Sequence, residues 1–294
     1  MTNSGFMLVD EQTFPTRFPD LPFVIGHRLA DHSLFNLPRL LALARALPPS
    51  CVEYNSGLLA VDQDPDSMPS NGLSVRETIA RIGENSSWMV LKNVERDGQY
   101  ARLLHACLDD IRQHSESLAP GMDVPEGYIF ISSPHAITPF HIDPEHNFLA
   151  QVCGRKTVFV FDAQDRELLS ERQLERLYGA NARRNLPYRE EFAGRARSFT
   201  LHPGQALYLP QNSPHWVRNE DAVSISFSAT FRSALSEKRS RLYHMNNRLR
   251  AAGLQPYPVG LSPLRDTLKD FAFRGGSKAM AWLTGRPGLL EARY

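Results

Sequence analysis

One short segment holds the residues of this chain that are best suited to chemistry. In Ile137–Asp162, His141 and Asp143 stand two positions apart, and Lys156 follows fifteen residues after His141. The segment otherwise has the β-branched and aromatic composition of strands, in which residues two apart face the same side of the sheet. We therefore predict that the imidazole of His141 and the carboxylate of Asp143 project together, as two ligands for a metal ion.

A metal site needs a third ligand, and His215 is the candidate. It follows a strand-like segment and a turn within Gly204–Asn219, and a closed barrel would bring it opposite the first pair. Two histidines and one carboxylate with open positions bind iron(II) in non-haem oxygenases, and zinc accepts the same donors. The alternative is that each histidine is an ordinary half-buried residue with a hydrogen-bond partner, because a lone His-x-Asp also arises by chance.

The segments around these residues predict a β-rich core over residues 126–231. Short runs of β-branched and aromatic residues are bounded there by Gly, Pro, Asn or Asp, which is typical of a sandwich or barrel. The expected strands lie at 128–133, 137–143, 147–154, 156–162, 198–204, 206–210, 215–219 and 222–231. One helix, Asp165–Gly179, is expected to interrupt them.

Helices are expected on both sides of this core. Residues 1–125 mix helix and strand, and Ser74 with Glu77 forms a capping-box pattern. Residues 232–294 become helical again. The expected helices are Leu34–Pro48, Leu73–Ile82, Tyr100–Leu118, Ser236–Gly253, Ser262–Gly276 and Ser277–Gly285, with a strand within Ser87–Val94. We thus divide the chain into an N-terminal α/β region (1–125), a barrel (126–231) and a C-terminal helical extension (232–294).

Composition limits the partners and the compartment. The chain has 294 residues, 42% of them hydrophobic, and 33 basic against 32 acidic side chains give a formal net charge of +1. This balance argues against a protein that coats nucleic acid, and the basic residues from Arg232 to Arg250 read as a solvated helix face. Cys51, Cys107 and Cys153 are too far apart for a disulfide framework. With no signal peptide and no apolar run of about 20 residues, we expect a cytoplasmic protein without a membrane span.

The segment that contains His215 also resembles a known motif of small barrels. Gly204, Pro210, His215 and Asn219 follow the spacing of the second cupin motif, although Asn212 stands where cupins usually have glycine. The His-x-Asp pattern of His141 is similar to that of the Jumonji-C (JmjC) branch of the cupins, the iron(II) and 2-oxoglutarate dependent oxygenases. The resemblance covers roughly residues 128–231. It implies a mainly β fold with flanking helices, built on a double-stranded β-helix (jelly-roll).

The resemblance to the asparaginyl-hydroxylase type of Jumonji-C protein extends to single residues. It implies that His141, Asp143 and His215 hold Fe(II). It also implies that the cosubstrate 2-oxoglutarate is bound by five residues: Tyr128, Thr138, Asn147, Lys156 and Ser228. Lys156 would pair with the distal carboxylate, which explains a lysine inside an apolar run. Ser228 stands where the family has asparagine, and this departure concerns the metal-side carboxylate.

The implied activity is the hydroxylation of a protein side chain or of a small molecule. No zinc-finger or reader-module spacing is present, which argues against a chromatin demethylase. Two alternatives stay open: a non-catalytic regulatory barrel that binds a metal or a small acid, and a zinc or iron cupin enzyme that needs no 2-oxoglutarate. Apolar residues of the C-terminal extension, from Leu242 to Leu283, must be buried somewhere, and we expect them to form a homodimer.

Overall fold

The computed structural model describes residues 5–64, 67–179 and 186–284, the last eight of these by their backbone alone. The chain forms two compact units. The first comprises Met1–Asp165 and Asn185–Ser233, and the second comprises Arg166–Arg184 and Ala234–Tyr294. The predicted mainly β fold with flanking helices is confirmed, while the division into residues 1–125, 126–231 and 232–294 stays a prediction.

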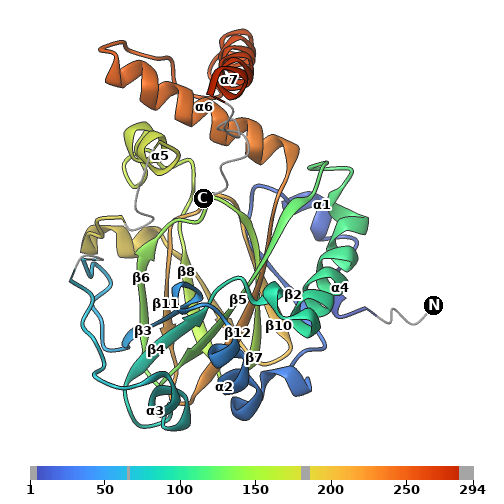
Figure 1. The fold of residues 1–294 in the computed structure, drawn as a ribbon, viewed down its shortest axis with the longest axis vertical. Helices are drawn as coiled ribbons and strands as arrows, with labels where there is room; N and C mark the ends of the chain where they lie inside the picture. Colours follow the sequence, from blue (N-terminus) through green and yellow to red (C-terminus); the bar gives the residue numbers. More distant parts are fainter. Residues whose placement is uncertain (1–4, 65–66, 180–185, 285–294) are drawn as a thin grey trace. The chain divides into compact units, whose positions relative to one another are not determined.

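The first unit contains an eight-stranded antiparallel sheet with the order β1-β2-β10-β7-β12-β5-β4-β3 (Figure 1). In chain order its strands are β1 (Met7–Leu8), β2 (Phe23–His27), β3 (Val52–Ser56), β4 (Ser87–Leu91), β5 (Asp123–Ser132), β7 (His146–Cys153), β10 (Gln205–Leu209) and β12 (Ser224–Arg232). The strands before residue 100 lie at the two edges: β2 pairs with β10, and β4 pairs with β5. The N-terminal region therefore widens the barrel sheet instead of forming a sheet of its own.

A second antiparallel sheet has four strands in the order β6-β11-β8-β9. They are β6 (Ile137–His141), β8 (Lys156–Val160), β9 (Arg197–Leu201) and β11 (His215–Asn219). Leu149 of β7, Val158 of β8 and Leu207 of β10 belong to one buried cluster, so side chains from both sheets meet in a shared interior. This cluster is the apolar part of the barrel core, and the alternation along each strand decides which residues reach it.

The other face of the large sheet packs against the N-terminal helices. Phe148 of β7 and Phe227 of β12 join one cluster with Leu43 and Leu104, which come from two of these helices. The helices are α1 (Phe14–Arg17), α2 (Leu37–Ala46), α3 (Val75–Ala80) and α4 (Gly98–Ser115). β12 is consequently buried on both faces, with Ile225, Phe227, Ala229 and Phe231 toward the helices and Ser224, Ser226, Ser228 and Thr230 toward the barrel interior.

Local capping sets the start of the helices. The capping box predicted at Ser74 is present, with the Ser74 hydroxyl accepting from the Glu77 N–H and the Glu77 carboxylate accepting from the Ser74 N–H. A second box, Ser170 with Gln173, starts helix α5 (Glu171–Leu177). The predicted start of this helix at Asp165 is wrong, because Ser170 supplies the N-cap and the residues before it turn without forming a helix.

The second unit consists of α5, α6 (Ala234–Ala251) and α7 (Pro263–Thr284). The expected helix Ser236–Gly253 agrees with α6. The two expected segments after it are one continuous helix, so the break predicted at Gly275 and Gly276 is wrong: glycine lowers helix stability without removing a backbone hydrogen bond. None of the described helices is long and apolar enough to cross a membrane.

Candidate metal centre and its surroundings

A β-bulge aligns the residues of the candidate site on β6 and β11. The two strands pair His215 with His141 and Val217 with Thr138, with a shift of register in between. Two steps along β11 therefore match three steps along β6. Because Val217 belongs to the barrel interior, its partner Thr138 faces the interior as well. The bulge thus allows both Thr138 and His141, three positions apart, to face the same space.

The three predicted ligands converge. Nε2 of His141 lies 3.8 Å from Oδ2 of Asp143, and Nε2 of His215 lies 3.7 Å from the same oxygen. One donor atom from each residue lies within 4.8 Å of the others, so a single ion can reach all three. Their side chains are 18%, 19% and 5% exposed in chain order, which leaves the site open on one side.

Backbone carbonyl groups orient the two histidine rings. Nδ1 of His141 lies 2.7 Å from the carbonyl oxygen of Pro139, and Nδ1 of His215 lies 2.9 Å from that of Ser213. A carbonyl oxygen only accepts, so each Nδ1 carries a proton, and Nε2 is the ring nitrogen that a metal ion would bind. The Nε2 atoms are the ones that approach Asp143. This fixed tautomer is the arrangement that a metal-binding histidine requires.

Lys156 lies inside the barrel. It shares a strand face with Val158 and Val160, is 4% exposed, and makes no ion pair with a carboxylate of the residues that the structure describes. Burial lowers the pKa of Lys156 from 10.5 to about 7. Its Nζ lies 5.9 Å from the ring centroid of Phe130 on β5. A buried amine without a carboxylate partner favours the binding of an acidic ligand, whose carboxylate accepts a hydrogen bond from the ammonium group.

Thr138 and Tyr128 already make hydrogen bonds to other side chains. The Thr138 hydroxyl oxygen accepts a 3.0 Å hydrogen bond from Nε1 of Trp88, and the Tyr128 hydroxyl donates to Glu126 over 3.1 Å. These contacts orient both hydroxyl groups. Sequence reasoning missed Trp88 and Glu126, because only the pairing of β4 and β5 brings Trp88 near β6.

Asn147 and Ser228 carry buried polar atoms that lack partners. Oδ1 of Asn147 and Oγ of Ser228 are both inaccessible to solvent and form no hydrogen bond in the described part of the chain. Both residues face the barrel interior on neighbouring strands, where Ser228 pairs with Leu149 and Thr230 pairs with Asn147. Buried polar groups are normally satisfied, so these two atoms are the polar groups of the barrel interior that still need a hydrogen-bond partner.

Three further residues near the site have structural contacts. The two ring nitrogens of His146 lie 2.8 Å from the hydroxyl group of Tyr208 and 3.2 Å from that of Ser233. Phe140 packs against Phe161 on the side away from the triad. Trp216 stacks on Phe159 with ring centroids 3.9 Å apart, so its indole belongs to the other face of the small sheet.

Glu145 forms an ion pair that sequence reasoning missed. Its carboxylate is 2% exposed and accepts a 3.2 Å hydrogen bond from Arg232 at the end of β12. The pair ties the loop after Asp143 to the large sheet. A Glu two residues after a predicted ligand gives no sign of this role by itself, because the partner lies eighty-seven positions away.

The comparison of sequences establishes the family. The profile of the cupin-like domain matches residues 50–236, which is more than half of the chain. The chain therefore belongs to the cupin-like domain family, in agreement with its two-sheet barrel and with the resemblance on which the site residues were predicted.

Curated relatives match about a third of this chain. Over 100 residues the chain is 31% identical to Lysine-specific demethylase 8 of Xenopus tropicalis, covering 32% of this chain and 22% of that protein. A match of the same identity and length to Jumonji C domain-containing protein 5 of Drosophila melanogaster covers 24% of that protein. This chain thus spans less than a quarter of the length of these two relatives.

A solved structure extends the likeness to nearly the whole chain. The X-ray structure of E. coli ycfD superposes with a TM-score of 0.52 at 17% sequence identity, covering 94% of this chain and 68% of that one. At this identity the likeness supports the fold alone.

Proposed function

We propose that this protein is an iron(II) and 2-oxoglutarate dependent oxygenase that hydroxylates a protein side chain or a small molecule. One observation supports the proposal most strongly. The barrel that positions His141, Asp143 and His215 around one point also buries Lys156 without a carboxylate partner among the described residues. A metal-binding barrel that needs no acidic cosubstrate has no use for such an amine.

The described residues fit both parts of the cofactor. Two neutral imidazole Nε2 atoms and one carboxylate oxygen form the donor set that non-haem iron(II) oxygenases use. Lys156 would bind the distal carboxylate of 2-oxoglutarate through a charge-assisted hydrogen bond. Thr138 and Tyr128 would stand beside it. The orphan atoms of Asn147 and Ser228 give the interior further polar contacts for the ligand.

Iron(II) with 2-oxoglutarate supplies the oxidation of a C–H bond by dioxygen, with succinate and carbon dioxide as coproducts. The side chains of the barrel need no acid or base strength for this chemistry. The carbonyl groups of Pro139 and Ser213 hold the ligand imidazoles in one orientation, and the apolar cluster around Val158 excludes water from the interior. The protein therefore acts by binding and orientation.

The substrate class is the least constrained part of the proposal. One relative is called a lysine-specific demethylase, and a protein side chain is accordingly the first class to test. The triad is open to solvent on one side, because His141 and Asp143 are 18% and 19% exposed, so a side chain of another protein can approach the metal. A small molecule can use the same opening.

The first test is turnover of 2-oxoglutarate without a substrate. Purified protein with iron(II), ascorbate and 2-oxoglutarate should form succinate, measured by mass spectrometry, and Asp143→Ala should abolish it. His135→Ala is the matched control, because His135 is 65% exposed and lies outside the triad. A cell lysate incubated with the same components and ¹⁸O₂ would then identify the labelled product.

The same experiment separates the alternatives. A regulatory barrel would bind metal and 2-oxoglutarate and form no succinate above the Asp143→Ala background. A zinc or iron cupin without a cosubstrate would bind metal and leave 2-oxoglutarate unbound. Either result would overturn the proposed oxygenase.

We also propose a homodimer formed through α7. Leu264, Leu268 and Phe271 are 71%, 61% and 77% exposed and lie on one helical stripe. Phe273, by contrast, is buried within the second unit. The apolar residues Met280, Trp282 and Leu283, which were expected to take part, lie outside the described side chains.

A symmetric contact over this stripe would remove three large apolar groups from water. Light scattering at micromolar concentration should give twice the monomer mass, and Phe271→Glu should give the monomer. Arg274→Glu reverses a charge near the stripe without an apolar loss and serves as the control. A monomeric wild-type protein would contradict the dimer.

The compartment also stays a proposal. All three cysteines are free, and Cys153 is exposed. An exposed thiol persists most readily in a reducing compartment, which favours the cytoplasm.

A further inference from the structure

The second unit is strongly basic although the whole chain is nearly neutral. Residues 166–184 and 234–294 contain 16 lysines and arginines against 7 aspartates and glutamates, a net charge of +9. The remaining residues carry 17 basic and 25 acidic side chains, a net charge of −8. A positive charge of this size on about eighty residues attracts anionic partners.

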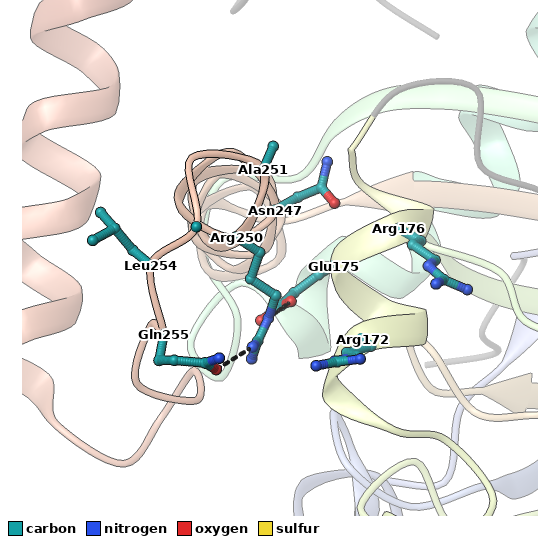
Figure 2. Close-up of a pocket in the computed structure, with 9 residues that line it drawn as sticks. Arg172, Glu175, Arg176, Asn247, Arg250, Ala251, Leu254 and Gln255 are labelled. Atoms are coloured by element: carbon teal, nitrogen blue, oxygen red, sulfur yellow. Dashed lines mark hydrogen bonds and ion pairs between the residues drawn. The ribbon is translucent and has the colours of Figure 1, made fainter.

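A cavity within this unit concentrates the positive charge. It measures about 380 Å³ and lies between α5 and the C-terminal end of α6 (Figure 2). The polar residues that line it are Arg172, Glu175 and Arg176 from α5, and Asn247, Arg250 and Gln255 from α6 and the segment after it. Three arginines and one glutamate thus line this space.

Only one of the three arginines is paired with that carboxylate. Nε of Arg250 donates to Glu175, and its Nη1 donates to Gln255 over 3.2 Å, as Figure 2 shows. Arg172 and Arg176 are exposed and form no ion pair with any carboxylate that the structure describes. They stand four positions apart on α5, which places both on the same side of the helix.

The buried carboxylate of Glu175 also limits which ligand can bind in the cavity. The residue is 1% exposed, and its Oε1 atom is buried without a hydrogen-bond partner in the described part of the chain. A buried carboxylate oxygen without a donor is costly, and an N–H group of a ligand would satisfy it. The cavity therefore calls for a ligand that carries acidic groups and N–H donors together.

The frame around the cavity is rigid enough to hold this arrangement. Tyr178 at the end of α5 stacks on Tyr243 of α6, with ring centroids 5.6 Å apart and an angle of 7° between the planes. Nδ1 of His244 donates to the carbonyl oxygen of Tyr178 over 2.7 Å. A Cβ atom at Gly179 would collide with the side chain of Asn247, so glycine is needed for this close approach. A preorganised cavity binds with less loss of entropy.

We propose that the cavity between α5 and α6 binds an acidic peptide segment of a partner protein. Carboxylate side chains of the peptide would accept hydrogen bonds from Arg172 and Arg176. A peptide N–H would donate to Oε1 of Glu175. The phosphates of a nucleic-acid backbone offer acceptors alone and would lie near the Glu175 carboxylate, so the polar groups of the cavity favour a peptide over a nucleic acid.

Fluorescence anisotropy tests the proposal on the full chain. The probe is a fluorescein-labelled peptide of alternating glutamate and glycine, with a glutamine-for-glutamate peptide and a labelled oligothymidylate as comparisons. The glutamate peptide should bind, and added salt should weaken it. The double substitution Arg172→Gln and Arg176→Gln should lower its affinity about tenfold or more, since two hydrogen bonds to charged groups are lost.

Matched controls make the outcome specific to the cavity. Arg265→Gln with Arg274→Gln removes the same charge from exposed positions on α7 and should change the affinity by less than about threefold. Arg172→Glu with Arg176→Glu should lose the glutamate peptide and gain a lysine–glycine peptide. If both double glutamine variants lost peptide affinity equally, the attraction would be unspecific and the proposed site would be overturned. Binding of oligothymidylate without binding of the glutamate peptide would overturn the choice of ligand.

Discussion

Replacing Lys156 by methionine should stabilise the ligand-free protein and weaken its binding of 2-oxoglutarate. Burial lowers the pKa of Lys156 from 10.5 to about 7 in the folded chain, whereas the unfolded chain exposes the same amine to water. At about 1.4 kcal/mol for each pKa unit, the buried amine lowers the free energy of unfolding by about 4 kcal/mol at pH 7. Methionine has a similar length and carries no charge, so Lys156→Met removes this loss.

The predicted gain depends on pH in a defined direction. Between the folded pKa of about 7 and the unfolded value of 10.5, the unfolded chain binds more protons at this amine than the folded chain does. The stability of the wild type therefore rises with pH in this window. The advantage of Lys156→Met should fall from about 4 kcal/mol at pH 7 to about 2 kcal/mol at pH 9.

Urea unfolding followed by tryptophan fluorescence at both pH values measures this difference. Lys92→Met is the control, because Lys92 is 37% exposed and pairs with Glu53 on the surface, so its replacement should give neither the gain nor the trend. Calorimetric titration with manganese(II) present should show a loss of 2-oxoglutarate affinity of about ten- to a hundredfold. If Lys156→Met were no more stable than the wild type at pH 7, the claim that burial of the Lys156 amine destabilises the folded protein would be refuted.

Three further outcomes follow from single contacts. Asp143→Ala should abolish the visible absorption of bound cobalt(II), which His135→Ala should retain, because Asp143 supplies the oxygen that both histidines approach. Ser228→Ala should leave the free energy of unfolding nearly unchanged, because the Ser228 hydroxyl has no partner among the described residues. Ser226→Ala should lower the free energy of unfolding by about 1 kcal/mol, because it breaks the hydrogen bond to Gln151, and urea unfolding compares the two variants. Ser74→Ala should cost about 1 kcal/mol in the same assay, because it removes the N-cap of α3.

The strands of the barrel and the approach of His141 to Asp143 were predictable because they depend on local pattern. The β-branched and aromatic runs at 147–154 and 156–162 predicted two strands, which the structure forms as β7 and β8. The spacing of His141 and Asp143 placed two ligands together without knowledge of the rest of the barrel. The bulge between β6 and β11 was not predictable, because a shift of register depends on how the two strands pair and gives no signal in the sequence of either strand.

Contacts between distant segments were beyond the sequence. Trp88 donates to Thr138 from a strand fifty positions earlier, and Arg232 reaches Glu145 from the end of β12. The start of α5 could have been predicted, because Ser170 and Gln173 have the same capping pattern that was used at Ser74. The error came from extending an apolar helical pattern past its cap.

A row of serine and threonine side chains on β12 makes one wall of the barrel interior polar. Leucine and valine side chains from β7, β8 and β10 fill the interior, as expected for a small barrel. β12 contributes serine and threonine instead, whose side chains are smaller than leucine and carry hydroxyl groups. Phe130, which lies near the Lys156 amine, pairs with Ser226 in this row, so the amine reaches the polar wall. An acidic ligand held by Lys156 would therefore lie near β12, where the Ser228 hydroxyl has no partner among the described residues.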